Sequence, residues 1–229
     1  NMQGHDQYFE NVNGEYFERK SRDIFPNTPW GSMSIKVFDF DNDTDMDIII
    51  SDMHSDMSED ISSEREKLKS RMQWPESTLQ SGGTSIYGNA FFRNNGDGTF
   101  TDVAEAAGVT NHRWSKGVVW GDYNGDGLLD LYVSNFGAGN RLYRNLGRGS
   151  FVNDAPRLGV AAPTGSFPAW FWDVDNDGVL DLYVSAYSAD IEHLAASALD
   201  VPVNVEPSRL YRGTEGGGFE EVSERYGLT

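Results

Sequence analysis

The sequence contains no cysteine, few basic residues and no long apolar run. Without Cys the chain forms no disulfide, has no thiol nucleophile and offers no thiolate to zinc. Its 18 Lys and Arg are outnumbered by 36 Asp and Glu, which gives a net charge of −18. That charge argues against nucleic acid and anionic lipid as partners, because basic side chains neutralise phosphate in such complexes. No apolar run approaches the roughly 18 residues of a transmembrane helix.

Recognisable catalytic motifs are missing as well. The sequence has no Gly-x-Ser-x-Gly elbow, no phosphate-binding P-loop and no His-Glu-x-x-His. We therefore assign no catalytic residue, and we predict a binding or scaffold module in preference to an enzyme.

A nine-residue pattern of oxygen-bearing side chains occurs three times. Positions 1, 3, 5 and 9 of each copy are Asp or Asn, and an apolar segment rich in β-branched or aromatic residues follows at once. Such a segment is typical of a β-strand. We name the copies loop 1, loop 2 and loop 3, and they occupy residues 39–47, 122–130 and 173–181.

The ligand chemistry of these loops favours Ca²⁺, which accepts about six to eight oxygens in a flexible shell. Mg²⁺ demands a stricter octahedral geometry, and zinc is disfavoured because the four His lie outside the loops. We predict about three calcium sites, with position 7 supplying a main-chain carbonyl. The predicted ligands are Asp39, Asp41, Asp43, Asp45, Asp47, Asp122, Asn124, Asp126, Leu128, Asp130, Asp173, Asp175, Asp177, Val179 and Asp181.

The acidic pattern of the loops has two other interpretations. An EF-hand is excluded, because position 12 of each copy lies in an apolar segment, where an EF-hand has a bidentate Glu. Acidic turns without metal remain an alternative, since Asp, Asn and Gly are ordinary turn formers. Repulsion among the uncompensated carboxylates argues against that alternative.

Loop 1 departs from the pattern at position 6. Loops 2 and 3 have Gly127 and Gly178 there, which suit a tight curl with positive φ, whereas loop 1 has Thr44. A β-branched residue is disfavoured in that conformation. We therefore expect loop 1 to be the weakest of the three candidate sites.

A second motif accompanies the loops. Two short apolar segments flank a turn rich in Gly and Asn, which predicts a β-hairpin. The copies occupy residues 8–17, 91–100, 142–151 and 210–219.

The spacing of the motifs predicts the architecture. Loops 2 and 3 begin 51 residues apart, and one such period contains a strand, a loop, a second strand, a connection and a hairpin. Four strands in about 50 residues are typical of a β-propeller blade. Loops 1 and 2 begin 83 residues apart, and the excess matches a polar insert at about 51–86, part of which has helix-forming residues.

The motifs resemble those of the FG-GAP/VCBS-type repeat family, which includes the calcium-loop propellers of integrin α-subunits. Residues 120–133, Trp-Gly-Asp-Tyr-Asn-Gly-Asp-Gly-Leu-Leu-Asp-Leu-Tyr-Val, and 142–145, Leu-Tyr-Arg-Asn, are most similar to the ASPIC/UnbV and cartilage-acidic-protein group. The resemblance implies an all-β propeller, commonly seven-bladed, with calcium in a loop of each such blade. We expect one partial propeller domain over 1–229, with repeat units at about 8–54, 87–136, 141–187 and 209–229.

The predicted role follows from these expectations. Loops of this kind stay filled where calcium is plentiful, so we expect an extracellular, cell-surface or periplasmic location. We expect a protein partner, extracellular matrix or a glycan, and assembly into a larger complex. The alternatives are a lectin and a propeller-type polysaccharide hydrolase or lyase, because fold alone does not decide function.

Two sets of side chains outside the loops complete the expectations. The aromatic residues that precede loops 2 and 3 are expected to fill the core between blades, with carbohydrate stacking as the minority alternative; they are Trp120, Trp170, Phe171 and Trp172. The arginines that flank the hairpins are expected to form hydrogen bonds between blades, with ligand binding as the minority alternative; they are Arg141, Arg144, Arg209 and Arg212.

Overall fold

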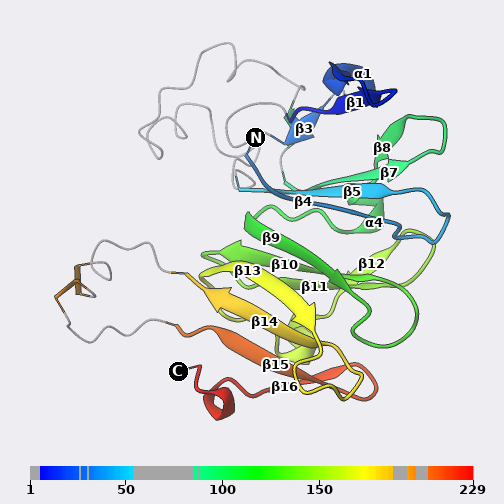
Figure 1. Cartoon of the computed structure of the whole chain (residues 1–229). Helices are drawn as coiled ribbons and strands as arrows, with labels where there is room; N and C mark the ends of the chain where they lie inside the picture. Colours follow the sequence, from blue (N-terminus) through cyan, green and yellow to red (C-terminus); the bar gives the residue numbers. More distant parts are fainter. Residues whose placement is uncertain are drawn as a thin grey trace. The chain divides into compact units, whose positions relative to one another are not determined.

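The computed structural model describes residues 6–25, 27–29, 31–53, 85–86, 88–187, 195–196, 198–199 and 206–228. These residues are nearly all β-structure with a few short helices, as predicted (Figure 1). They include three four-stranded antiparallel sheets, each built like a propeller blade. Most of the predicted insert, 54–84, lies outside the described residues.

The chain divides into two compact units, residues 1–115 and 116–229. The first unit contains one blade, which we name blade 1, with the strand order β4-β5-β7-β8. Its strands are β4 (Ser32–Phe38), β5 (Asp47–Asp52), β7 (Ala90–Asn94) and β8 (Phe100–Asp102).

Smaller elements accompany blade 1 in the same unit. An antiparallel hairpin joins β1 and β2, and β3 pairs in parallel with β6. The edges of the predicted insert are therefore strand, because β5 continues through Asp52 and β6 follows the undescribed segment. These elements are β1 (Phe9–Val12), β2 (Tyr16–Arg19), α1 (Ser21–Ile24), β3 (Thr28–Pro29), β6 (Ser85–Ile86) and α4 (Ala104–Ala107).

The second unit contains two blades. Blade 2 has the order β12-β11-β10-β9, and blade 3 has the order β13-β14-β15-β16. Blade 2 is formed by β9 (Trp114–Gly121, whose first two residues fall in the first unit), β10 (Asp130–Phe136), β11 (Arg141–Asn145) and β12 (Phe151–Asn153). Blade 3 is formed by β13 (Ser166–Trp172), β14 (Asp181–Ala186), β15 (Arg209–Thr214) and β16 (Gly218–Glu221).

All three blades follow the same path. The first two strands are joined by the acidic loop, and the last two form the predicted hairpin. Register is equivalent in each: Tyr132 of β10 pairs with Leu142 of β11, as Tyr183 pairs with Leu210. Each blade ends with a hairpin, whereas the predicted repeat units begin with one. Unit 87–136 therefore supplies the hairpin of blade 1 and the first two strands of blade 2.

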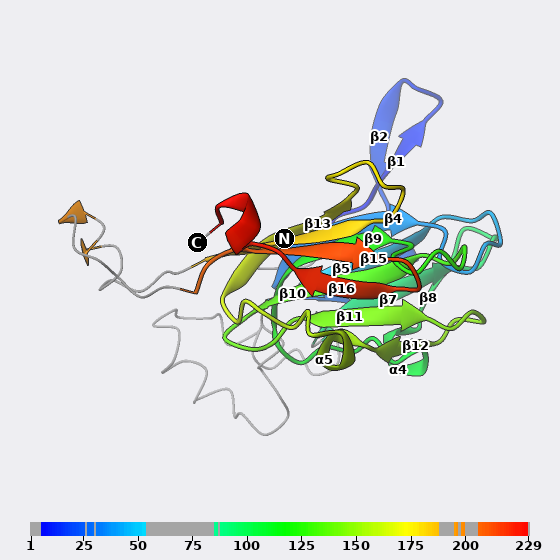
Figure 2. The same cartoon turned by 90° about the horizontal axis from the view of Figure 1, so that it is seen from below.

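A short helical turn follows each of the three blade hairpins. These turns are α4, α5 (Ala155–Leu158) and η1 (Glu224–Tyr226), and Figure 2 shows α5 beside β11 and β12. Each ends at a glycine in the left-handed conformation, Gly108, Gly159 or Gly227, with φ of 75°, 72° and 75°. Glycine adopts that conformation without a steric penalty, so it ends the turn. No helix among the described residues is long and apolar enough to cross a membrane.

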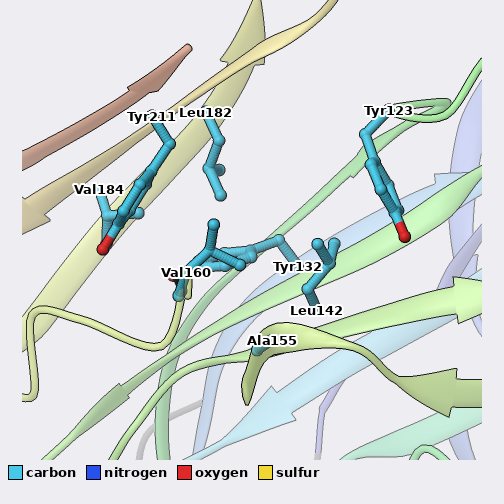
Figure 3. Close-up of a cluster of buried hydrophobic side chains, with 8 residues drawn as sticks. All are labelled: Tyr123, Tyr132, Leu142, Ala155, Val160, Leu182, Val184 and Tyr211. Atoms are coloured by element: carbon cyan, nitrogen blue, oxygen red, sulfur yellow. Dashed lines mark hydrogen bonds between the residues drawn. The ribbon is translucent and has the colours of Figure 1, made fainter. Parts of the chain in front are cut away.

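The core of the second unit lies between blades 2 and 3 (Figure 3). Tyr132 of blade 2 is fully buried there, and its hydroxyl donates to the carbonyl oxygen of Val160 over 2.8 Å. The buried cluster also contains Tyr123, Leu142, Ala155, Leu182, Val184 and Tyr211. The first unit has a separate cluster, in which the Phe25 and Phe92 rings meet edge-on at 4.9 Å.

Strand alternation sorts the aromatic residues of β13 onto two faces. Phe171 packs against the core between the blades, as predicted. Trp170 points to the opposite face and is 42% exposed, so its predicted place in the core was wrong. Its ring lies 4.5 Å from that of Tyr183 and 5.7 Å from that of Trp172. Successive side chains of a strand alternate between faces, which separates neighbouring residues of this aromatic run.

Blades 2 and 3 lie in close contact at Gly121. A Cβ at this position would lie 2.8 and 2.9 Å from two carbons of the Phe171 ring. We expect Gly121→Ala to lower the free energy of unfolding by about 1–3 kcal/mol through overpacking. A urea titration of the purified chain measures this loss. The control is Gly139→Ala, whose new methyl would sit 3.5 Å from that of Ala161, and equal stability of the two variants would contradict the prediction.

Candidate metal centres

Each acidic loop connects the first and second strands of its blade. Loop 1 lies between β4 and β5, loop 2 between β9 and β10, and loop 3 between β13 and β14. Position 9 of each loop is the first residue of the second strand, at Asp47, Asp130 and Asp181. The strand geometry therefore anchors one end of every loop.

The backbone curls at the same two positions in all three loops. Position 6 has positive φ, with 77° at Thr44, 84° at Gly127 and 88° at Gly178. The expectation from the glycines is confirmed, and Thr44 adopts a conformation that is strained for a β-branched residue. Position 4 is also left-handed in each loop, with φ of 60°, 72° and 59°; its residues are Asn42, Gly125 and Asn176.

The carboxylate at position 1 organises the curl. In loop 3, Asp173 accepts hydrogen bonds from the backbone N–H groups of Asp177 (3.0 Å) and Gly178 (2.8 Å). Asp39 and Asp122 accept the equivalent pairs in their own loops. Position 5 repeats this behaviour, since Asp177 accepts from the N–H of Val179 over 2.9 Å. Side chains at alternate positions are thus held toward the inside of the curl.

Carboxylate oxygens converge in two of the loops. One oxygen from each of positions 1, 3 and 5 lies within 4.8 Å of the others in loops 1 and 3. Loop 2 has an amide at position 3, and the Asn124 side-chain oxygen accepts from the N–H of Asp126 over 2.9 Å. The acidic clusters can therefore hold a metal ion, because hard cations prefer closely spaced oxygens.

A buried carboxylate oxygen in loop 1 also fits a bound cation. The Oδ1 atom of Asp41, at position 3, is buried and accepts no hydrogen bond within the described part of the chain. Burial, together with the charge of Asp43, raises the pKa of Asp41. A bound cation would satisfy this oxygen. Asp45, the extra acid of loop 1, instead lies against the next hairpin, where its carboxylate would contact a Cβ placed on Gly96.

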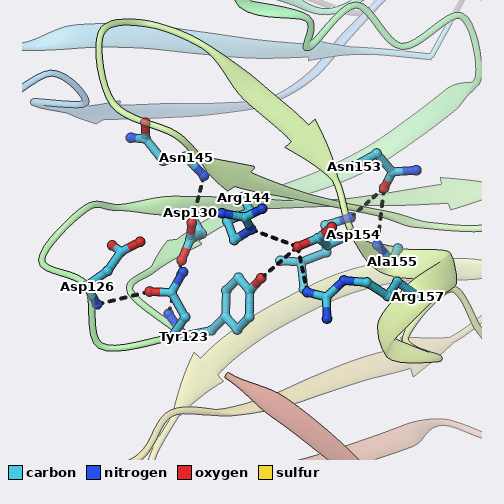
Figure 4. A network of polar contacts seen from close by, with 11 residues as sticks. Tyr123, Asp126, Asp130, Arg144, Asn145, Asn153, Asp154, Ala155 and Arg157 are labelled. Atoms are coloured by element: carbon cyan, nitrogen blue, oxygen red, sulfur yellow. Dashed lines mark hydrogen bonds and ion pairs between the residues drawn. The ribbon is translucent and has the colours of Figure 1, made fainter. Parts of the chain in front are cut away.

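The carboxylate at position 9 joins the loop to the hairpin. Asp130 is fully buried and accepts from the backbone N–H of Tyr123 (3.3 Å) within the loop and from that of Asn145 (2.8 Å) on β11 (Figure 4). Asp47 and Asp181 form the same two types of bond in their own blades. Each carboxylate oxygen has a second lone pair, so this role leaves the predicted role as a metal ligand open.

Burial disfavours the ionised form of these carboxylates. It raises the pKa of Asp130 to about 7 and that of Asp47 to about 6. The two N–H donors of each oppose the rise, and neighbouring loop carboxylates add to it. A positive ion in the loop would stabilise the ionised forms, since opposite charge favours a charged carboxylate.

Comparison with known proteins agrees with this geometry. The family described as FG-GAP-like repeat matches residues 80–133 and 122–184. The chain contains FG-GAP-like repeats. Loops 2 and 3 lie within the matched residues and loop 1 lies outside them, in keeping with its departure at Thr44.

Curated relatives carry the resemblance further. The chain is 35% identical over 100 residues to cartilage acidic protein 1 of Homo sapiens and of Mus musculus. It is 31% identical over 98 residues to that of Xenopus tropicalis. Each match covers 42% of this chain and 15% of the relative's length. The resemblance predicted from the sequence motifs is confirmed.

Three of the arginines that flank the hairpins form ion pairs within their own blades. Arg144 contacts Asp154 over 2.8 Å in blade 2, and Arg209 lies 3.6 Å from Glu221 in blade 3. Arg212 contacts the loop of its own blade. The expectation of bonds between blades was therefore wrong for these three arginines. Paired strands place hairpin side chains next to the loop and turn of the same sheet, within reach of a guanidinium.

Two contributors to the repeat were not predicted. One is the left-handed residue at position 4, which the recurrence of Asn and Gly there would have indicated. The other is the hairpin Asn of the Leu-Tyr-Arg-Asn motif. The Asn145 amide donates to the carbonyl oxygen of Leu129 over 3.1 Å and accepts from the N–H of Gly147 over 2.9 Å. It thereby holds position 8 of loop 2 against the hairpin turn.

Substitution at Asp130 tests its structural role. Asp130→Asn removes a buried charge, but it replaces one of the two acceptor oxygens with an amide nitrogen. That nitrogen cannot accept from the N–H of Tyr123 or Asn145 that it faces. We expect a net loss of about 1–3 kcal/mol of unfolding free energy in EGTA at pH 8. Denaturant unfolding measures it. Asp126→Asn is the control, because its amide oxygen still accepts from the N–H of Leu128; an equal loss in both variants would refute the assignment.

Proposed function

We propose that this chain is a calcium-stabilised β-propeller module that mediates protein–protein interaction, adhesion or complex assembly outside the cytoplasm. The observation that carries the proposal is the threefold repetition of one loop geometry, with oxygen ligands directed inward. Three unrelated acidic turns would not share left-handed residues at positions 4 and 6 and the same hydrogen bonds to the carboxylates at positions 1, 5 and 9.

The donor set fits Ca²⁺. In loop 2 the ligands would be Asp122, Asn124, Asp126 and Asp130, with the main-chain carbonyl of Leu128. Loop 3 would use Asp173, Asp175, Asp177 and Asp181, with the carbonyl of Val179. Loop 1 would use Asp39, Asp41, Asp43 and Asp47, with the main-chain carbonyl of Asp45 at position 7. All donors are oxygens, and calcium accepts a more variable number and arrangement of oxygen ligands than Mg²⁺, which demands near-ideal octahedral geometry.

The role of the ion would be structural. It would cancel repulsion among the clustered carboxylates and favour the folded state by mass action. The strain at Thr44 supports a weaker affinity in loop 1, because part of the binding free energy would be offset by holding that backbone.

The relatives support the class of partner. Their name associates them with cartilage and with acidity, and this chain has a net charge of −18. A matrix or cell-surface protein is therefore the proposed partner. Proteins of such locations meet calcium concentrations at which sites of this type fill.

A glycan is the second candidate partner. The rings of Trp170 and Tyr183 are in tilted contact on one face of blade 3, where Trp170 is exposed and Trp172 adjoins them. Exposed aromatic rings contribute large apolar area at low entropic cost and are common in recognition surfaces. A glycan array would separate a lectin from a protein-binding module.

Calcium dependence of stability tests the proposal. We expect thermal unfolding of the chain to shift upward in Ca²⁺ relative to EGTA, by roughly 10 °C for one site at a hundredfold excess over Kd. Mg²⁺ should give a much smaller shift. Scanning calorimetry measures it.

Loop variants assign the shift. Asp126→Asn should reduce the calcium-induced shift and leave the unfolding temperature in EGTA almost unchanged, because it keeps its backbone bond. Glu224→Gln, an exposed charge change outside the loops, is the matched control. If EGTA and calcium give the same unfolding temperature for the parent chain, the calcium proposal fails.

A further inference from the structure

The two repeats of the second unit place equivalent arginines in different surroundings. Arg144 and Arg212 each follow a Leu-Tyr pair in the third strand of their blade. The strand pairing is equivalent, because Leu142 and Leu210 pair with Tyr132 and Tyr183. The backbone therefore brings both arginines to the same place beside the acidic loop.

In blade 2 the arginine has a dedicated acid. Nε of Arg144 lies 2.8 Å from Oδ2 of Asp154, and Nη2 of Arg157 lies 2.8 Å from the same oxygen. The Tyr123 hydroxyl is 3.4 Å from it (Figure 4). Arg157 and Arg144 hold the pKa of Asp154 below its usual range. Among the described residues, Arg144 forms its ion pair with Asp154 and not with loop 2.

Blade 3 lacks that acid. The N–H of Asp154 donates to the carbonyl oxygen of Leu142 over 2.7 Å, and the N–H of Val222 donates to that of Leu210 over 2.9 Å. Val222 is thus the structural counterpart of Asp154. Position 2 of the loop changes with it, from Tyr123 to Val174. An arginine at this place in blade 3 has apolar neighbours where blade 2 offers a carboxylate and a hydroxyl.

Arg212 turns to loop 3 instead. Its Nε lies 2.9 Å from Oδ2 of Asp175, and its Nη2 lies 3.3 Å from Oδ2 of Asp177. These carboxylates hold positions 3 and 5, which are candidate calcium ligands. The Val179 N–H and the Arg212 guanidinium hold the pKa of Asp177 below its usual range.

We propose that Arg212 is a built-in competitor of calcium in loop 3, one that neutralises the loop when the ion is scarce and lowers its affinity for the ion. The inference rests on the proposed calcium function. The guanidinium and the ion would use the same two carboxylates, and their like charges repel, so one must withdraw for the other to bind. The contact is partly exposed, since 34% of the Arg212 side chain is accessible, so solvent screens the repulsion between the guanidinium and the ion. We therefore expect Arg212 to lower the calcium affinity of loop 3 by about tenfold.

The consequence is a graded response within one module. Loop 2, whose arginine is held elsewhere, would fill at lower calcium concentration than loop 3. Loop 3 would stay ordered in both states, since its carboxylates always have a positive partner. Blade 3 would thus respond to calcium over a range in which blade 2 is already saturated.

Charge removal at Arg212 tests the inference directly. Calorimetric titration of the full chain with CaCl₂ should show one site tightened about tenfold in Arg212→Met. The gain should vanish in Arg212→Met combined with Asp173→Asn, which disables loop 3. Arg209→Met is the matched control, because it removes the same charge from the same strand, at a side chain that pairs with Glu221, and it should leave all affinities unchanged.

Stability supplies a second readout. Arg212→Met should lower the unfolding temperature in EGTA, where loop 3 loses its counter-charge, and should not lower it in saturating calcium. Arg209→Met should have equal effects in both conditions. A loss at Arg212 that is equal with and without calcium would overturn the inference.

A third test gives Arg212 an alternative acidic partner and leaves the arginine itself in place. Val222→Asp recreates the acid of blade 2 and should draw Arg212 away from the loop, again raising calcium affinity at loop 3. Val222→Asn, equally polar but uncharged, should not. Calcium binding that is unaffected by Arg212→Met overturns the inference and leaves the proposed function standing, whereas no calcium binding by the parent chain or by Arg212→Met overturns both.

Discussion

The rest of each blade depends on the hydrogen bonds accepted by one buried carboxylate, that of the Asp which begins the second strand. Asp130 accepts a hydrogen bond from one backbone N–H of its own loop and from another on β11, the next strand along the chain and the first of the hairpin. A single side chain therefore fixes the acidic loop relative to the sheet. Because a buried carboxylate without donors is costly, the chain cannot place the loop and the hairpin independently.

The same scaffold supports different local electrostatics. Blade 2 surrounds Asp154 with two guanidinium groups and a tyrosine hydroxyl, whereas blade 3 has Val222 at that place and Arg212 in the loop. Neither change disturbs strand order or register. Repeats diverge most easily at side chains that face a partner within the blade, since the backbone bonds that define the blade are satisfied without them.

The sequence predicted the strands, the hairpins and the loops because each is encoded locally. Each of these elements depends on residues only a few positions apart: apolar residues in a strand, Gly and Asn in a turn, and acidic residues in a loop. The glycines at position 6 correctly predicted positive φ. The sequence predictions were wrong where the outcome depended on which face of a strand a side chain occupies or on which residue it pairs with. Trp170 lies on the exposed face of β13, and Arg144, Arg209 and Arg212 pair inside their blades.

By itself, then, the sequence determined the FG-GAP-like repeat, its blade of four strands and the oxygen-rich loops, because period and turn chemistry are short-range properties of the chain. Only the tertiary structure decided that position 9 ties the loop to the hairpin and that Arg212 enters loop 3. Those outcomes depend on residues far apart in sequence, such as Asp181 with Gly213 and Arg212 with Asp175, which meet only after the strands have paired.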